Sequence, residues 1–194
     1  MENRFINAGF NTFIPLKNIE IITDLFHLKD FKVKKQELKL REKFINITGQ
    51  NKSRSCVLTI DPTMFQSFIK SETIIKEQYR ENFLSIGSKF NSFINIDNIE
   101  FIAEYNKNRA SIKKLLEERK YENRLYNLTR NNKYRSIIVM KKTENVYISP
   151  VRAITLIDRM WLFVYKSWKQ FLFKISGHKR NYTLFNLLQK NIFK

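Results

Sequence analysis

The sequence predicts an α+β protein made of two tandem, small β-rich modules, each with one main helix, followed by a helical tail. Residues 11–22 read NTFIPLKNIEII and residues 91–102 read NSFINIDNIEFI, and seven of these twelve positions are identical. Each copy is followed by the same order of β-rich and charged segments. Self-similarity at a fixed period marks a repeated structural unit, so the chain is expected to contain the same fold twice.

The repeat extends in both directions from these stretches. Phe5–Gly9 aligns with Phe83–Gly87, which places half of the four glycines at equivalent positions. Each copy also closes on a similar segment. These matches divide the chain into repeat one at 1–76, repeat two at 82–157 and an unrepeated tail at 158–194. The closing segments are Ser67-Phe68-Ile69-Lys70 and Ser149-Pro150-Val151-Arg152.

Each repeat predicts the same order of elements. Two β-rich runs come first, and Pro15 bends the second of them or places it at a sheet edge. A charged helix follows, then two strands around a polar turn, which is a hairpin signal, and a last short element. In repeat one these segments are strands at 5–10 and 13–23, a helix at 30–42, strands at 44–48 and 54–60, and a closing element at 63–69.

The second copy shows the helix more clearly. Ile112, Leu115 and Leu116 fall on one face of a helix at 109–120, with basic residues on the other face. A module of about 75 residues lies near the lower size limit for independent folding. Short strands also leave edges and apolar faces uncovered. We therefore expect the modules to pack in tandem and the chain to self-assemble.

The charge of the chain indicates an anionic partner. Lysine and arginine number 36 against 18 acidic residues, which gives a formal net charge of +18. An AT-rich genome explains many lysines and asparagines, but not the shortage of acids. Hydrophobic residues make up 43% of the chain, enough to build a core. Nucleic acid or a membrane surface is the expected partner.

Cysteine content and hydropathy favour a cytoplasmic protein. Cys56 is the single cysteine and is expected to be a buried strand thiol, so no intramolecular disulfide forms. The first ten residues lack the pattern of a signal peptide. The longest apolar run, Met160–Tyr165, is far shorter than the roughly 20 residues that span a bilayer.

Four motifs occur in a fixed order along the repeats. They are F-I-N-x-G-F at 5–10, I-x-I-I at 19–22, I-K-K-L-L-x-E at 112–118 and N-x-T at 127–129, ahead of a basic turn. These motifs, in this order, resemble those of the RemA-like extracellular-matrix regulatory proteins, short bacterial DNA-binding regulators of biofilm genes. Family members usually have one such unit, and here there are two. The resemblance implies ring-shaped oligomers with DNA bound along a basic rim.

The basic turns are the first candidate binding site. The turn of each copy contains cations and no acid, and exposed cations on a rigid turn can contact phosphates. The consecutive arginines of the family are replaced by Asn51-Lys52 and Asn132-Lys133, which keeps positive charge but loses bidentate geometry. A solvated turn is the alternative. The expected DNA-binding residues are Lys52 and Arg54 in repeat one and Arg130, Lys133 and Arg135 in repeat two.

Helix cations are the second candidate site. Lys34 and Lys35 align by sequence with Lys113 and Lys114, and all four could contact phosphates. The alternative is a solvated helix face whose lysines pair with glutamates one turn away.

The tail contains an amphipathic segment, and the sequence shows no catalytic or metal-binding motif. Residues 157–175 form an amphipathic pattern that can cap the modules, bind another subunit or lie at a membrane interface. The two histidines have no metal-ligand spacing to each other or to Cys56, and no glycine-rich phosphate loop is present. Glu20 and Glu100 are expected to be edge or solvent-side residues. We therefore expect no enzyme activity, no cofactor and no metal.

The expected function is double-stranded DNA binding by a transcriptional or nucleoid-architectural regulator. Two units in one chain raise avidity, because the second unit binds intramolecularly. One alternative is a single-stranded DNA or RNA binder that stacks bases on Tyr126 and Tyr134. The other is a membrane-surface scaffold that acts through the 157–175 segment.

Overall fold

The computed structural model describes residues 4–24, 28–75, 79–87, 91–129 and 133–161. Met1–Asp158 form one compact unit, which contains both repeats, and Arg159–Lys194 form a second. Residues 153–161 are helical. The rest of the predicted tail, including most of the amphipathic segment at 157–175, lies outside the described residues.

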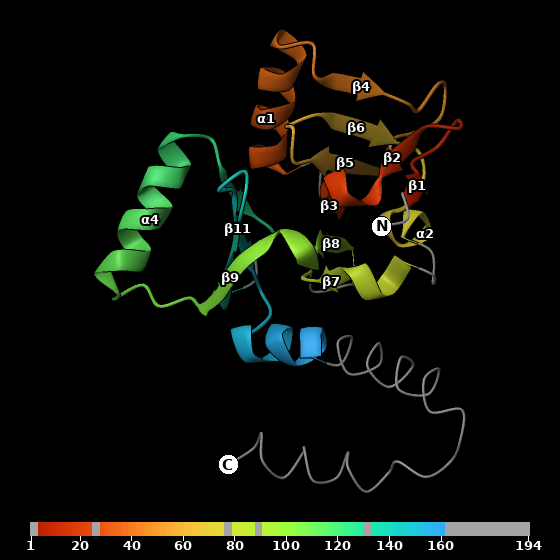
Figure 1. Ribbon diagram of the computed structural model, residues 1–194. Coiled ribbons are helices and arrows are strands. Elements are labelled where there is room, and N and C mark those ends of the chain that lie inside the picture. Colours follow the sequence, from red (N-terminus) through yellow and green to blue (C-terminus); the bar gives the residue numbers. More distant parts are fainter. Residues whose placement is uncertain (1–3, 25–27, 76–78, 88–90, 130–132, 162–194) are drawn as a thin grey trace, which may run out of the picture. The chain divides into compact units, whose positions relative to one another are not determined.

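Both repeats have the same order of strands around one main helix, which confirms the predicted α+β class and the two-module organisation (Figure 1). Repeat one contains strands β1 (Phe5–Asn7), β2 (Phe13–Pro15) and β3 (Ile19–Thr23), helix α1 (Lys29–Leu40), strands β4 (Phe44–Asn46), β5 (Ser55–Thr59) and β6 (Met64–Ser67), and the short helix α2 (Ser71–Ile74). Repeat two contains β7 (Phe83–Ser85), β8 (Ser92–Asn95), β9 (Ile99–Glu104), α4 (Ala110–Tyr121), β10 (Leu125–Asn127), β11 (Ser136–Met140) and β12 (Val146–Ser149).

The predicted strand at 13–23 is two strands. Pro15 ends β2, a 3-10 turn follows at Leu16–Asn18, and β3 begins at Ile19. Proline has no backbone N–H to donate to a strand ladder. The backbone N–H of Leu16 still donates to Arg4 O at 2.8 Å, and the chain then turns away at Leu16–Asn18. Repeat two makes the same break without proline, because Asn95 accepts a hydrogen bond from the backbone N–H of Asp97 at 3.1 Å.

The predicted hairpin between β4 and β5 is wrong. Strand β6 lies between them, parallel to β4 and antiparallel to β5, and β12 lies in the same way between β10 and β11. The segment at 47–54 therefore crosses one end of β6. The backbone N–H of Ile47 donates to Gln66 O at 3.0 Å, and that of Arg54 donates to Ser67 O at 2.8 Å. A polar segment between two β-rich runs predicts a hairpin, and the local sequence cannot show that a later strand lies between the two.

The ends of helices α1 and α4 align the two repeats differently from the sequence match of their lysines. Both helices are followed by a residue with positive φ, Glu42 at 58° and Asn123 at 56°. In this alignment the buried Phe31 corresponds to the buried Ile112, and Lys34 and Lys35 correspond to Leu115 and Leu116. The match of Lys34-Lys35 to Lys113-Lys114 is displaced by two residues.

The two repeats share a sheet. Strand β8 of repeat two pairs antiparallel with β3 of repeat one, which produces the six-stranded order β4-β6-β5-β3-β8-β7. The strands β10-β12-β11-β9 form a four-stranded sheet, and β1-β2 form a two-stranded sheet. The first hairpin of repeat two thus completes the sheet of repeat one. One hydrophobic cluster accordingly contains Ile22 of repeat one together with Phe83 and Phe93 of repeat two.

A buried carboxylate also joins the repeats. Glu20 of β3 is fully buried, and its Oε1 accepts hydrogen bonds from Tyr147 Oη at 2.5 Å and from Asn145 Nδ2 at 2.7 Å. Burial raises the pKa of Glu20 above its usual 4.5, and the hydrogen bonds from Tyr147 and Asn145 oppose that rise. The expectation of an edge or solvent-side position is wrong for Glu20. Glu100 is exposed, as expected.

The structure confirms Cys56 as a buried strand thiol in β5, and burial raises its pKa above the usual value. Such a thiol is a poor nucleophile at neutral pH. Within the part of the chain that the structure describes, no helix is both long enough and apolar enough to cross a bilayer.

Candidate nucleic-acid interface

The loop that leads from β4 to β5 in repeat one, and from β10 to β11 in repeat two, begins with the motif N-x-T. Asn46 Oδ1 accepts hydrogen bonds from the Thr48 backbone N–H at 3.2 Å and from Thr48 Oγ1 at 2.9 Å. Asn127 and Thr129 make the same two contacts at 3.0 and 2.7 Å. Asparagine turns of this kind fix the backbone locally. The motif therefore sets the same starting geometry for both basic loops.

The end of each loop lies beside the segment that follows β6 or β12. Ser55 Oγ donates to Ile69 O at 2.5 Å, and Ser136 Oγ donates to Val151 O at 2.7 Å. These contacts bring Lys70 in repeat one and Arg152 in repeat two to the ends of the loops that contain the predicted cations. We define basic cluster one as Lys52, Arg54 and Lys70, and basic cluster two as Lys133, Arg135 and Arg152, all six of them exposed.

Basic cluster two surrounds a shallow hollow of about 290 Å³, lined by its three cations together with Glu104, Tyr105, Tyr134 and Ile154. Glu104 is committed to the protein, since its Oε1 accepts the backbone N–H of Ala153 at 3.0 Å. In repeat one Asp24 does the same for Ser71 at 2.8 Å. Each acid caps the start of the helix that follows its cluster. Three cations around a hollow of this size can hold a phosphate group.

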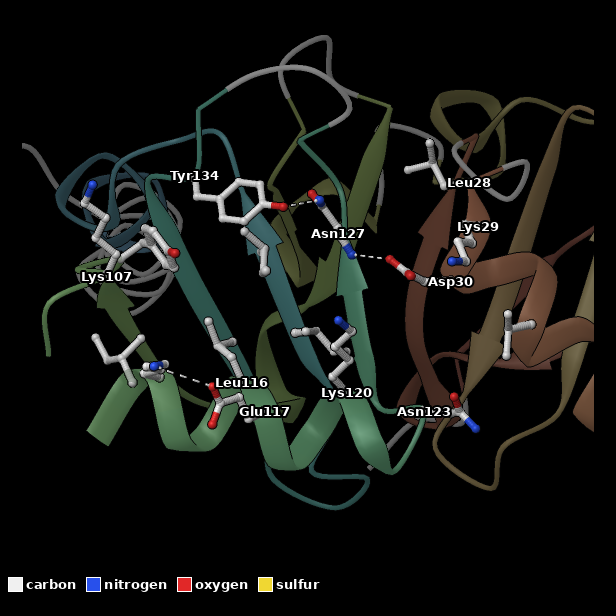
Figure 2. Close-up of a pocket in the computed structure, with 16 residues that line it drawn as sticks. Leu28, Lys29, Asp30, Lys107, Leu116, Glu117, Lys120, Asn123, Asn127 and Tyr134 are labelled. Carbon is white, nitrogen blue, oxygen red and sulfur yellow. Dashed lines mark hydrogen bonds and ion pairs between the residues drawn. The ribbon is translucent and has the colours of Figure 1, made fainter. Parts of the chain in front are cut away.

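The loop of cluster two is also fixed by repeat one. Asp30 Oδ2 of α1 accepts the backbone N–H of Asn127 at 2.8 Å, and Asn127 Nδ2 donates to Tyr134 Oη at 2.8 Å. Figure 2 shows this chain of contacts along a pocket of about 670 Å³ between α1 and α4. Tyr134 also packs edge-on against Tyr105, with ring centroids 5.3 Å apart. Helix α1 therefore helps to position the neighbours of Lys133 and Arg135.

The structure separates the remaining predicted residues into three groups. Arg130 lies outside the described residues. Lys34 is buried, and its Nζ pairs with Glu37 at 3.0 Å. Lys35 donates to Gln66 Oε1 at 2.5 Å, and its Nζ lies 4.7 Å from the centroid of the Phe44 ring. Burial, followed by the charge of Lys39, lowers the pKa of Lys35. Lys34 and Lys35 are therefore committed to contacts within the module.

Lys113 and Lys114 are exposed on α4. Each lies 3.9 Å from a glutamate four residues later, Glu117 and Glu118 respectively. Exposed pairs of this kind contribute little and leave a lysine able to contact phosphates. Arg119, near the end of α4, and Arg124, which follows the helix, are engaged in ion pairs instead. Arg119 and Arg124 both pair with Glu122 and Glu144.

The two tyrosines proposed as stacking platforms lie in different environments. Tyr126 is 1% exposed and stacks on Tyr147, with ring centroids 5.0 Å apart, so it cannot stack on a base. Tyr134 is 36% exposed. Within the described residues, no group of three histidine, cysteine, aspartate or glutamate side chains is arranged to hold a metal ion.

The fold defines the chain as a tandem pair of small α+β modules. Each module carries one basic cluster. Comparison with known families gives a match to the RemA-like family, described as extracellular matrix regulatory protein A-like, over residues 5–77 and again over 83–160. The chain belongs to this family and contains two of its units. A comparison with curated proteins finds no match.

Sequence comparison of the repeats missed Lys70 and Arg152 as site residues. The signal was present, because the two residues close the matching segments at 67–70 and 149–152. Their closeness to the loops depends on β6 and β12 lying beside β5 and β11. Sequence spacing alone does not reveal that arrangement.

Proposed function

We propose that this protein is a regulator that acts in the cytoplasm by binding double-stranded DNA through the two basic clusters. The observation that carries the proposal is the recurrence of the same three-cation group at the same place in both modules. A single basic loop is ordinary. Two basic loops that start with the same asparagine turn and end with the same serine contact indicate a binding surface. The family description, that of a regulatory protein, supports the regulatory part of the proposal.

The composition of the clusters favours contacts to phosphate over base-specific contacts. Three of the six cations are lysines, which act as point charges and lack the fork geometry of arginine. Phosphate contacts fix the protein on the duplex without reading its sequence. Arg54, Arg135 and Arg152 remain able to bind phosphate or a guanine edge in a bidentate way. We therefore propose a largely sequence-tolerant binder, either a transcriptional or a nucleoid-architectural regulator without enzyme activity.

The single-stranded alternative has less support. Single-strand binders combine a charged groove with several exposed aromatic side chains, and of the two tyrosines considered only Tyr134 is accessible. The membrane alternative depends on residues 157–175, which lie mostly outside the described part of the chain. We keep both as outcomes of the binding experiment.

The proposal predicts a steep dependence of duplex binding on salt. If all six cations contact phosphates, the slope of log affinity against log salt is about −5, from roughly −0.9 per contact. Fluorescence anisotropy with a labelled duplex, repeated at several salt concentrations, measures this slope. Unlabelled single strands and RNA of the same sequence should compete poorly, and anionic liposomes should not compete.

Equal competition by single strands would favour the single-stranded alternative. Tight liposome binding without duplex binding would favour the membrane alternative. A duplex affinity that does not change with salt would show that the clusters do not bind through phosphate contacts.

A further inference from the structure

The pocket between α1 and α4 is lined by residues of both repeats. Its volume of about 670 Å³ lies within the range of roughly 300–1,000 Å³ that is typical of small-molecule sites. One wall includes the start of α1, and another includes α4, from Ile112 to Lys120, about 12 Å of helix (Figure 2). Its aliphatic lining residues are Leu28, Val33, Ile112, Leu116, Leu125 and Ile148. The pocket is therefore a groove with aliphatic side chains from both modules.

This aliphatic lining is not a general property of the module. When the ends of α1 and α4 are aligned, Val33 corresponds to Lys114, and Leu116 corresponds to Lys35. Each helix therefore presents an aliphatic residue to the pocket where the other helix has a lysine. Val33 retains 37% of its accessible surface. Exposed helix positions usually have polar residues, so these two exchanges indicate an apolar occupant.

Lysines surround the same pocket. Four lysines line it against two acids, and both acids are engaged. Asp30 accepts the backbone N–H of Asn127 at 2.8 Å, and Glu117 pairs with Lys113 at 3.9 Å. The other three lysines make no ion pair with any acid of the described residues, and Figure 2 shows them at separate points around the pocket. These three are Lys29, Lys107 and Lys120.

We propose that this pocket binds a free long-chain fatty acid, with its hydrocarbon chain between α1 and α4 and its carboxylate at one of the three lysines. Burial of apolar surface drives the entry of the chain. Lysine suits the charged end, because its aliphatic stem packs on apolar surface while its ammonium group stays in water. The contact between ammonium and carboxylate is a charge-assisted hydrogen bond. The basic segment at 158–194 fits less well, because its cations would meet these lysines.

The pocket adjoins basic cluster two. Tyr105 and Tyr134 line both the pocket and the hollow of that cluster. Tyr134 also accepts the hydrogen bond from Asn127 that helps to hold the loop of Lys133. A bound fatty acid adds negative charge beside the cluster and should therefore weaken duplex binding. This link to DNA rests on the proposed function, whereas the fatty-acid site does not.

Isothermal titration calorimetry of the full chain with dodecanoate, below its micelle concentration, tests the site. One dodecanoate should bind per chain, and each methylene added between octanoate and dodecanoate should raise affinity roughly fourfold. Dodecanol has the same chain without the charge and should bind at least about tenfold more weakly. Many equal sites per chain, or an affinity that does not rise with chain length, would overturn the proposal.

Two matched substitutions on α1 locate the site. Val33→Glu places a carboxylate inside the pocket and should weaken dodecanoate binding at least about tenfold. Leu40→Glu makes the same change of charge on the same helix. Leu40 is 88% exposed and does not line the pocket, so this variant should bind dodecanoate like the unchanged chain. Circular dichroism checks that both variants fold.

A lysine variant with exposed substitutions tests the charged end of the ligand. Replacing the three unpaired lysines by glutamine should lower dodecanoate affinity to that of dodecanol and leave dodecanol binding unchanged. The control replaces three exposed lysines outside the pocket and should keep both affinities. Equal losses in the two variants would overturn the carboxylate contact. The site variant is Lys29→Gln, Lys107→Gln and Lys120→Gln, and the control is Lys17→Gln, Lys32→Gln and Lys142→Gln.

Anisotropy with a labelled duplex separates this proposal from the DNA-binding one. Dodecanoate, at a concentration that saturates the unchanged chain, should weaken its duplex binding severalfold and leave that of Val33→Glu unchanged. Dodecanoate binding by a chain that binds no duplex would remove the proposed function and keep the site. An unchanged duplex affinity would remove the link between the two. If Val33→Glu binds dodecanoate as tightly as the unchanged chain, the site itself is overturned.

Discussion

Replacing all six cations of the two basic clusters by glutamine should lower duplex affinity by at least about 100-fold at physiological salt, because each lost phosphate contact removes counterion release. The remaining log–log salt slope should approach zero. The substituted residues are Lys52, Arg54, Lys70, Lys133, Arg135 and Arg152, all exposed, so the fold should be retained. Anisotropy titrations, with circular dichroism to check the fold, measure this result.

A matched control separates the clusters from net charge. Six exposed lysines elsewhere, replaced by glutamine, give the same reduction in formal charge, from +18 to +12. This control should lose less than about tenfold in affinity, because distant charges act only through a screened field. If the two variants lose the same affinity, the clusters are not a site. The control lysines are Lys17, Lys32, Lys107, Lys113, Lys114 and Lys120.

The buried carboxylate between the repeats should make stability depend on pH. Burial raises the pKa of Glu20 above its usual 4.5, so between these two values the folded chain holds a proton that the unfolded chain has lost. Stability from this group is therefore full below about pH 4.5 and decreases as the pH rises to the folded pKa. Thermal unfolding at pH 5 and pH 8 should show this decrease.

Glu20→Gln should remove most of that pH dependence and raise the melting temperature at pH 8 by about 3 °C, as about 1 kcal/mol does in a unit of this size. Tyr147→Phe should destabilise the protein by about 2 kcal/mol, since it removes a hydrogen-bond donor to a buried carboxyl oxygen. Glu100→Gln is the control, because Glu100 is exposed and should change neither profile. An unchanged pH profile in Glu20→Gln would contradict the role of Glu20.

Local patterns in the sequence predicted the modules well. The N-x-T motif begins a turn in both repeats, and α1 and α4 lie within about two residues of the predicted helices. These features depend on neighbours close in the chain. The insertion of β6 between β4 and β5 depends on a strand that comes later, so the same letters also fit a simple hairpin.

Identical residues in identical motifs can still have different environments. Glu20 and Glu100 stand in the same N-I-E stretch, yet only Glu20 is covered by the neighbouring repeat. Lys34 looked like the counterpart of Lys113, but the ends of the helices align it with Leu115, and it is buried accordingly. Which face of one repeat is covered by the other repeat cannot be predicted from the sequence of that repeat alone. Both differences therefore required the structure.

Lysine footprinting with and without duplex DNA tests the central claim most directly. An amine-reactive label, located by mass spectrometry, reports which side chains the DNA covers. Saturating duplex should protect Lys52, Lys70 and Lys133 from labelling, while labelling of Lys113 and Lys114 should change little. Protection of Lys113 and Lys114, with the three cluster lysines still labelled at their free rate, would contradict it and would place the DNA on α4.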